Sequence, residues 1–436
     1  MTDRRSFLSA LAAIPLARAL PGGPKTARPM DELTLVSSKP RMPADIHATG
    51  EEFWRELRKE FTLNRDETFF NTGTLGASPK AVQDAVIDHM RHVDRDIARW
   101  DYKPDTENYF TGYYPELAYR EKVAAVIGAK GHDIALCQNA TFGMNFLANG
   151  LELAPGDEIV ATSMDHPGGR MGFELRAKRQ GIVTKQITLP DPATDLTPDQ
   201  LVDLYLGQTT PRTKLWAIPH INSGRATRFP VERLAAAARE RGIFSAVDGA
   251  QSLGHLAIDV TALGCDAIYG SPHKWLLAPK GTGMLWVHPD KQAHLWSTIA
   301  SSAWDDQHDR MYGIMQMGTG NLSLLVGLGV ACDFHQQIGS QRIQDRIVGM
   351  GDQLRAGVKA LGGHIISPMH PQLTCASTVY GIPGKKGNEI QDFLWNRAKI
   401  RVRSMGDIGV RHTCHIYNSP ADVDRTLALL GQLARS

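Results

Sequence analysis

From about residue 70 onward, short apolar runs alternate along the chain with stretches of helical periodicity. Most of the runs are rich in Ile and Val and are bounded by Gly, Pro or Asp, which is typical of strands buried on both faces of a sheet. The runs are Asp133–Cys137, Glu158–Thr162, Ile182–Leu189, Lys214–Ile218, Ile243–Val247, Ala267–Tyr269 and Gly283–Val287. Helical patterns such as Val231–Arg241 separate several of them. The alternation predicts an α/β fold, with a mostly parallel sheet flanked by helices on both faces.

The pattern changes near Met317, where a segment rich in Gly precedes two long helical stretches, two short strands and a last helix. Their ranges are Leu322–Ile338, about Arg342–Leu361, near Ala376–Tyr380, Gly409–Tyr417 and Ala421–Ala434. We therefore predict a large domain over residues 67–316 and a smaller C-terminal α+β domain over residues 317–436. Ligands of parallel sheets bind at the carboxyl ends of the strands, so residues that directly follow the apolar runs are the candidates for function.

The N-terminus has the pattern of an export signal. Arg4 and Arg5 precede a short apolar stretch, Leu8–Ala17, and Ala17-Arg18-Ala19 places small residues at cleavage spacing. The arginine pair resembles a twin-arginine signal. We predict a signal peptide over residues 1–20, a tether and N-terminal arm over residues 21–66, and a periplasmic protein exported by the twin-arginine machinery. The alternative, an amphipathic first helix of the mature fold, is disfavoured by Pro15 and the Pro/Gly residues at 21–24.

Composition excludes several classes of partner. The chain of 436 residues is 42% hydrophobic with a formal net charge of +2, which gives no reason to expect nucleic acid. No apolar run approaches the ~20 residues that span a bilayer, so stable membrane insertion is not expected. The five cysteines are widely spaced and form no CxxC pair; free buried thiols are favoured over disulfides in a chain that folds in a reducing cytoplasm. His412, Cys414 and His415 put only two ligands on one strand face, so no metal site is expected.

Two polar residues follow buried strands. Lys274 lies in a turn beyond the run that ends at Tyr269, where partial desolvation would lower the pKa of its amine and make it a nucleophile. Asp248 ends another run and could hold a pyridine nitrogen protonated. Taken singly, Lys274 could be a solvated loop lysine and Asp248 a turn or helix-capping residue. Their spacing places them on successive strand ends, which favours a shared site.

Together with several other segments, these two residues make the chain resemble the class V aminotransferase family of fold-type I enzymes, which depend on pyridoxal 5′-phosphate (PLP). The resemblance runs from about Thr68 to the C-terminus. The matching segments are Phe69-Phe70-Asn71-Thr72-Gly73, Asn139-Ala140-Thr141, Asp165-His166, Asp248-Gly249-Ala250-Gln251, Ser271-Pro272-His273-Lys274-Trp275, Gly318-Thr319, Val410-Arg411 and Tyr417-Asn418. The family includes cysteine desulfurases, isopenicillin N epimerase and kynureninase.

The resemblance implies a role for each matching residue. Lys274 would carry PLP as a Schiff base, Asp248 would pair with the pyridine nitrogen, and His166 would stack on the ring. The phosphate would be bound at the start of a helix by Ala140 and Thr141, by Ser271 and His273, and by Thr319 of a neighbouring subunit in a homodimer. Gln251 would bind the ring hydroxyl. Arg411 would clamp the substrate carboxylate, and Asn71 would also bind the substrate.

Two departures from the family pattern bear on function. Residues 402–409 lack the loop cysteine of cysteine desulfurases, and Cys414 follows Arg411 on a predicted strand, so desulfurase activity is disfavoured. Arg225 and Arg228 lie in a loop near the expected cofactor, where either could bind an acidic group of the substrate or simply be solvated. We predict an exported PLP enzyme of aminotransferase or epimerase type that acts on an amino acid or on a metabolite derived from an amino acid or a peptide. The alternatives are a C–S or C–C lyase and a non-catalytic periplasmic binding protein.

Overall fold

The computed structural model describes residue 42, residues 50–99 and residues 116–436. All of these belong to one compact unit, Val36–Ser436. The predicted signal peptide, including Arg4 and Arg5, and most of the predicted tether lie outside the described residues.

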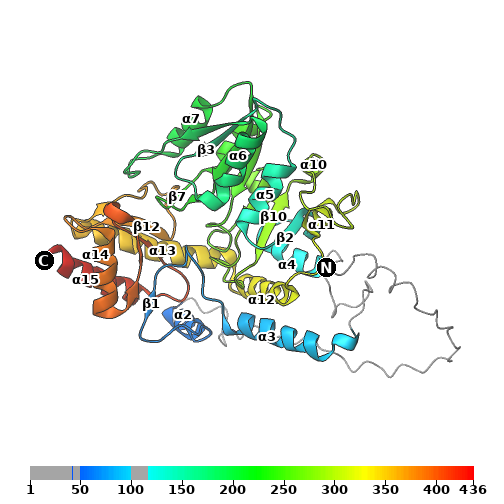
Figure 1. The fold of residues 1–436 in the computed structure, drawn as a ribbon. Coiled ribbons are helices and arrows are strands. Elements are labelled where there is room, and N and C mark those ends of the chain that lie inside the picture. The colour runs from blue at the N-terminus through cyan, green and yellow to red at the C-terminus, as the bar shows by residue number, and fades with distance from the viewer. Residues whose placement is uncertain (1–41, 43–49, 100–115) are drawn as a thin grey trace, which may run out of the picture. The chain divides into compact units, whose positions relative to one another are not determined.

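A seven-stranded sheet forms the centre of the large domain (Figure 1). In spatial order its strands are β2 (Ile134–Cys137), β10 (Gly283–Val287), β9 (Ala267–Gly270), β8 (Phe244–Asp248), β5 (Thr213–Pro219), β3 (Glu158–Thr162) and β4 (Val183–Ile187). All run in one direction except β10, which is antiparallel to both of its neighbours. Each strand coincides, to within two residues at either end, with one of the apolar runs. The predicted fold class is confirmed.

Both faces of this sheet are buried around its inner strands, which explains why most of their positions are apolar, whereas the edge strand β4 is polar at its centre and partly exposed. In β5, Trp216 and Ile218 join one hydrophobic cluster, while Leu215 and Ala217 join the cluster on the opposite face. The first cluster includes residues of α4 (Leu117–Val126), α7 (Pro198–Gly207), α8 (Val231–Arg239) and α12 (Leu322–Ile338). The second includes residues of α5 (Ala140–Gly150), α6 (Pro167–Gln180) and α11 (Arg310–Met315). Short helices at α9 (Val260–Leu263) and α10 (Pro289–Gln292) belong to the connections.

The C-terminal part contains a four-stranded antiparallel sheet and three helices. The strands, in spatial order, are β11 (His364–Ile365), β12 (Ser377–Gly381), β15 (Val410–Thr413) and β14 (Arg403–Ser404). The helices are α13 (Ser340–Ala360), α14 (Gly387–Ala398) and α15 (Pro420–Ala434). The strand predicted over Gly409–Tyr417 was too long, because the chain turns after Thr413. His415 N donates to Asn418 Oδ1 and Asn418 N donates to His415 O, both at 2.9 Å, which closes that turn.

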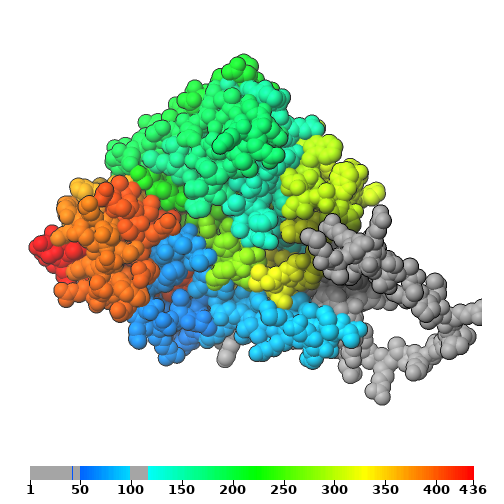
Figure 2. All heavy atoms as spheres, viewed as in Figure 1, coloured from blue at the N-terminus to red at the C-terminus, as the bar shows by residue number. Residues whose placement is uncertain are grey.

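The N-terminal segments join the C-terminal part to the large domain. Helix α2 (Glu51–Arg58) buries Phe53, Trp54 and Leu57 in the C-terminal core, and β1 (Thr68–Phe69) pairs with β13 (Ile400–Arg401). Helix α3 (Lys80–Arg95) packs along α12. In Figure 2 the blue residues accordingly adjoin both the orange C-terminal residues and the yellow α12 region. Contacts therefore cross both of the domain boundaries predicted near residues 66 and 316.

Two further properties hold for the described residues. Every helix there is too short or too polar to cross a membrane. All five cysteines are buried and unpaired.

Candidate active site

A cavity of about 360 Å³ lies at the carboxyl ends of the parallel strands. The turns after β2, β3, β5, β8 and β9 all supply lining residues, as expected for a ligand site in a sheet of this topology. Nine of the twelve predicted site residues line it: Ala140, Thr141, His166, Asp248, Gln251, Ser271, His273, Lys274 and Arg411. The fold thus brings together residues separated by up to 271 positions in the sequence, from Ala140 to Arg411.

Lys274 and Asp248 follow neighbouring strands, because β8 and β9 pair in parallel. Burial lowers the pKa of the Lys274 amine, and the nearby charge of Asp248 opposes that shift. Burial also raises the pKa of Asp248, whose Oδ1 accepts a 2.8 Å hydrogen bond from Ala250 N. A cation beside Asp248 would offset the cost of keeping this carboxylate charged.

The first turn of α5 forms one wall of the cavity. Asn139 caps this helix by accepting a 3.2 Å hydrogen bond from Phe142 N, and Ala140 N donates to Ser271 Oγ at 3.0 Å. Gly283 lets the turn sit against β10, since a Cβ there would lie 2.3 Å from Asn139 N. The helix dipole and the hydroxyls of Thr141 and Ser271 make this wall suitable for an anion.

His166 caps α6 and faces the same cavity. Its Nδ1 accepts a 3.0 Å hydrogen bond from Gly168 N. Partial burial lowers its pKa, and the charges of Lys274, Arg403 and Arg411 add to that shift, so the ring is held neutral. Beside it, burial raises the pKa of Asp165 to about 7 against the opposing hydrogen bonds from Thr162.

Gln251 is fixed by two neighbours. Its Oε1 accepts from Trp275 Nε1 at 2.8 Å, and its Nε2 donates to Gly73 O at 2.9 Å. Trp275 in turn stacks on His255, with ring centroids 3.8 Å apart. One amide hydrogen of Gln251 stays available to a ligand.

Arg411 and Arg403 line the cavity from the small C-terminal sheet. Arg411, on β15, is 4% exposed; it donates to Thr74 Oγ1 at 3.2 Å and to Ser223 O at 3.2 Å. Burial lowers its pKa to about 10, with a further contribution from Arg403. Arg403, on the edge strand β14, is exposed and donates to the same Thr74 oxygen at 3.3 Å.

Three predicted residues do not line the cavity. Thr319 is exposed and lies between Gly318 and Gly320, which line a separate cavity of about 240 Å³. Asn71 accepts a 2.9 Å hydrogen bond from Thr74 Oγ1 and so supports a residue that does line it. Arg225 follows β6 (Ile221–Asn222) and precedes β7 (Thr227–Arg228).

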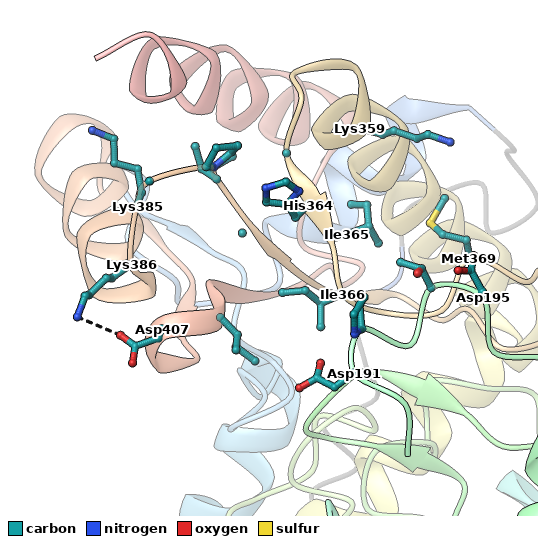
Figure 3. A pocket seen from close by; sticks show the side chains of 18 residues that line it. Asp191, Asp195, Lys359, His364, Ile365, Ile366, Met369, Lys385, Lys386 and Asp407 are labelled. Atoms are coloured by element: carbon teal, nitrogen blue, oxygen red, sulfur yellow. Dashed lines mark ion pairs between the residues drawn. The ribbon is translucent and has the colours of Figure 1, made fainter. Parts of the chain in front are cut away.

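Arg225 is bound away from the cavity. Its Nε donates to Asp191 Oδ1 at 3.0 Å, and its side chain is 12% exposed. Asp191 lines another cavity, of about 1040 Å³, between the loop at residues 191–195 and the C-terminal residues (Figure 3). Because Asp191 already neutralises this guanidinium, Arg225 is not placed to bind an acidic substrate. Arg228 donates its backbone N–H to Leu373 O and is also absent from the cavity lining.

Sequence reasoning missed Arg403, Thr74 and Asn222. Asn222 Nδ2 donates to Met164 O at 3.0 Å and to Asp165 Oδ1 at 3.3 Å, so it ties the loop after β5 to the turn that carries His166. Thr74 and Arg403 sit in segments that carried a signal, next to Gly73 and in the stretch before Arg411. Nothing in the pattern, however, showed that these two segments meet. Within the described residues no group of three or more His, Cys, Asp or Glu could hold a metal ion.

Comparison with known proteins adds a family to this geometry. Residues 69–427 match the family model of aminotransferase class-V proteins. The chain is 29% identical over 405 residues to an isopenicillin N epimerase of Amycolatopsis lactamdurans, with 88% of this chain and 99% of the relative covered. It is 26% identical over 432 residues to a probable cysteine desulfurase of Xylella fastidiosa (strain 9a5c), covering 92% and 98%. A variant of C-DES with glycine covalently linked to its PLP cofactor has the same fold, with a TM-score of 0.76 and 21% identity over 86% of this chain and 98% of C-DES.

Proposed function

The chain belongs to the aminotransferase class-V family, and we propose that it is a PLP-dependent enzyme acting on an amino acid or an amino-acid-derived metabolite. The observation that carries this proposal is the placement of Lys274 and Asp248 on adjacent strand ends, facing one cavity whose wall is the N-terminus of α5. A partly desolvated lysine beside a buried carboxylate in a cavity is typical of a functional site.

The residues present fit PLP. Its dianionic phosphate matches the backbone N–H groups and dipole at the start of α5, together with the Ser271 and Thr141 hydroxyls. Its pyridine nitrogen matches Asp248, the only acidic side chain among the described residues that line the cavity. Its ring hydroxyl matches the free amide hydrogen of Gln251. Lys274 would hold the cofactor covalently through Nζ.

When bound, PLP supplies an electron sink that stabilises negative charge at the substrate α-carbon. The chain supplies the rest. Asp248 would hold a proton on the pyridine nitrogen, His166 would cover the ring, and Arg411 would orient the substrate through its carboxylate. Lys274 Nζ would be the group that moves a proton at the α-carbon, because burial lowers the pKa of its amine below that of a solvated lysine.

We propose a reaction of the epimerase or aminotransferase type. The similarity to isopenicillin N epimerase covers 99% of that relative. No cysteine is among the described residues that line the cavity. Burial raises the pKa of the Cys414 thiol to about 12, and this side chain is fully buried, so it cannot act as a mobile thiolate nucleophile.

A PLP-dependent C–S or C–C lyase is the second candidate, because the similarity to probable cysteine desulfurases is comparable. The two reaction types are distinguished by incubating the PLP-loaded protein with a panel of amino compounds in D₂O and identifying the products. An epimerase or aminotransferase incorporates deuterium at the α-carbon and yields the other epimer or a keto acid. A lyase releases pyruvate, alanine or sulfide. A protein that exchanges no α-proton in any compound, although it is loaded with PLP, would contradict the leading proposal.

We further propose export through the twin-arginine pathway, supported by the Arg4-Arg5 pair and the apolar stretch that follows it. That pathway carries folded proteins, which suits a cofactor loaded before export. Replacing both arginines with lysine should leave the precursor in the cytoplasm. An unchanged amount of the double variant in the periplasm would refute the proposal.

Finally, we propose a homodimer in which Thr319 reaches the phosphate of the neighbouring subunit. Thr319 is exposed and lies outside the cavity lining of its own chain, which is consistent with that role. A mixed dimer of Lys274→Ala and Thr319→Ala subunits would then contain one intact site and bind one PLP normally. A monomer in sedimentation, or a mixed dimer without a normal site, would refute the shared site while leaving the PLP proposal intact.

A further inference from the structure

Two arginines that line the cavity have no acidic partner among the described residues. Arg411 and Arg403 are register partners on the neighbouring strands β15 and β14. Within the part of the chain that the structure describes, no carboxylate oxygen lies within 4.0 Å of either guanidinium. Both donate to Thr74 Oγ1, at 3.2 and 3.3 Å, so the sum of these distances limits the separation of the two donor nitrogens to 6.5 Å.

Without a bound anion, this arrangement of two guanidinium groups destabilises the protein. Like charges opposite each other on adjacent strands destabilise a sheet, and a buried cation is costly unless it is paired. The Nε of Arg411 is also buried without a hydrogen-bond partner. Proteins tolerate such local conflicts mainly at functional sites, where a ligand resolves them. A guanidinium pair of this kind calls for anions, and carboxylates match the guanidinium fork best.

The charge balance of the cavity favours two anionic groups over one. Among the described residues, the cavity lining carries three cationic side chains, Lys274, Arg403 and Arg411, against the single acid Asp248. If PLP binds Lys274 and Asp248, with its phosphate at the start of α5, the two arginines are the cationic groups that PLP leaves without a partner. The α-carboxylate of a substrate would neutralise the buried Arg411, while the exposed Arg403 would still lack a counterion.

We propose that the substrate carries a second acidic group and that Arg403 binds it, while Arg411 binds the α-carboxylate. This inference rests on the proposed function and assigns its substrate class: a dicarboxylic amino acid, or a larger amine with a second carboxylate at similar spacing. Arg403 is then the residue that determines specificity. Arg225, which the sequence suggested for such a role, is excluded from it by its pairing with Asp191.

A different use of the same residues is that both arginines grip one carboxylate. The two arrangements differ in what the loss of Arg403 does. With two acidic groups, Arg403→Gln weakens only ligands that have a second carboxylate. With one shared carboxylate, it weakens monocarboxylates and dicarboxylates equally.

The test is calorimetric titration of the PLP-loaded protein with simple acids that lack an amine and cannot react. Succinate, glutarate and adipate are compared with butyrate and valerate. We expect the best dicarboxylate to bind at least about tenfold more tightly than the monocarboxylates, the low end for a charged hydrogen bond. In Arg403→Gln that advantage disappears while monocarboxylate affinity is retained; Arg403→Lys restores part of it. Arg401→Gln is the matched control, because its guanidinium packs over Trp395, 4.2 Å from the ring centroid, and does not line the cavity.

Two results would overturn the inference. One is equal affinity of wild-type protein for monocarboxylates and dicarboxylates. The other is an equal loss of both in Arg403→Gln, with the melting temperature of the variant unchanged. The visible absorbance of each sample reports bound PLP independently. A sample without that absorbance contradicts the proposed function itself, whereas a coloured sample without dicarboxylate preference contradicts only this inference.

Discussion

The two sides of the cavity differ in how their polar groups are held. On the side formed by the turns after the parallel strands, Asp248, Ser271, His166 and Gln251 each have a hydrogen-bond partner within the chain. On the side formed by β14 and β15, Arg403 and Arg411 share one hydroxyl of Thr74 and have no acidic partner among the described residues. The first side is organised in advance for a permanent ligand. The second holds uncompensated charge that a transient ligand would neutralise.

The largest expected effect is the loss of the amine on the organised side. Lys274→Ala removes the covalent anchor and the group that moves the α-proton, so turnover should fall by more than about 10³-fold, within the range that a positioned acid–base group contributes. The variant should still bind PLP noncovalently, because the proposed phosphate site at the start of α5 is unchanged. Steady-state turnover and equilibrium dialysis of PLP check both statements. Turnover within tenfold of wild type would show that Lys274 is not the reacting amine.

On the other side of the cavity, Arg411→Gln should reduce kcat/KM for the substrate while leaving PLP affinity unchanged. Losing a charged hydrogen bond costs roughly 1.5–3 kcal/mol, which is about 10- to 150-fold. If the variant instead loses PLP, then Arg411 also contributes to cofactor binding, and the two sides of the cavity do not have separate roles. Arg225→Gln is a suitable control, since its guanidinium is bound to Asp191 outside the cavity and its removal should not change kcat/KM.

Gly169→Ala tests how tightly the organised side is packed. A Cβ at this position would lie 2.1 Å from Asp248 Oδ2, so the carboxylate or the start of α6 must shift. We expect a loss of stability of about 1–3 kcal/mol, typical of overpacking, together with weaker PLP binding. Gly207→Ala is the matched control, because no atom lies within 4 Å of its Cβ. Equal PLP affinity and equal denaturant midpoints for the two variants would show that the Asp248 pocket is loose.

The smallest effect concerns the thiol. Cys414→Ala should leave turnover unchanged, because the side chain is buried in the C-terminal core and does not line the cavity. Stability should fall by about 1 kcal/mol for the small void created. A large loss of turnover without unfolding would revive a thiol-dependent mechanism and the desulfurase interpretation.

Sequence reasoning brought the residues of the organised side together at one edge of the sheet, and for a physical reason. Its residues follow buried parallel strands directly, so the order of apolar runs already places Asp248 and Lys274 at one edge of the sheet. The strand ends themselves were predicted to within two residues, because burial on both faces makes most of the runs rich in apolar residues.

The substrate side could not be predicted in the same way. Arg403 sits on a strand of only two residues, too short to give a periodic pattern, and it meets Thr74 across 329 positions of sequence. Arg225 looked suitable because it is close in sequence to the residues after β5. The bond to Asp191, 34 positions away, is what turns its side chain elsewhere. Such pairings depend on tertiary contacts that propensity and periodicity do not encode.

The most direct test of the central claim is to reduce the PLP-incubated wild-type protein with borohydride and map the modified peptide by mass spectrometry. We predict that a reduced pyridoxal phosphate group is found on the peptide containing Lys274, and that Lys280→Ala, which removes a lysine from the same segment, leaves this modification in place. A protein that stays colourless after PLP is added and carries no such modification, or one that carries it on another lysine, would contradict the account.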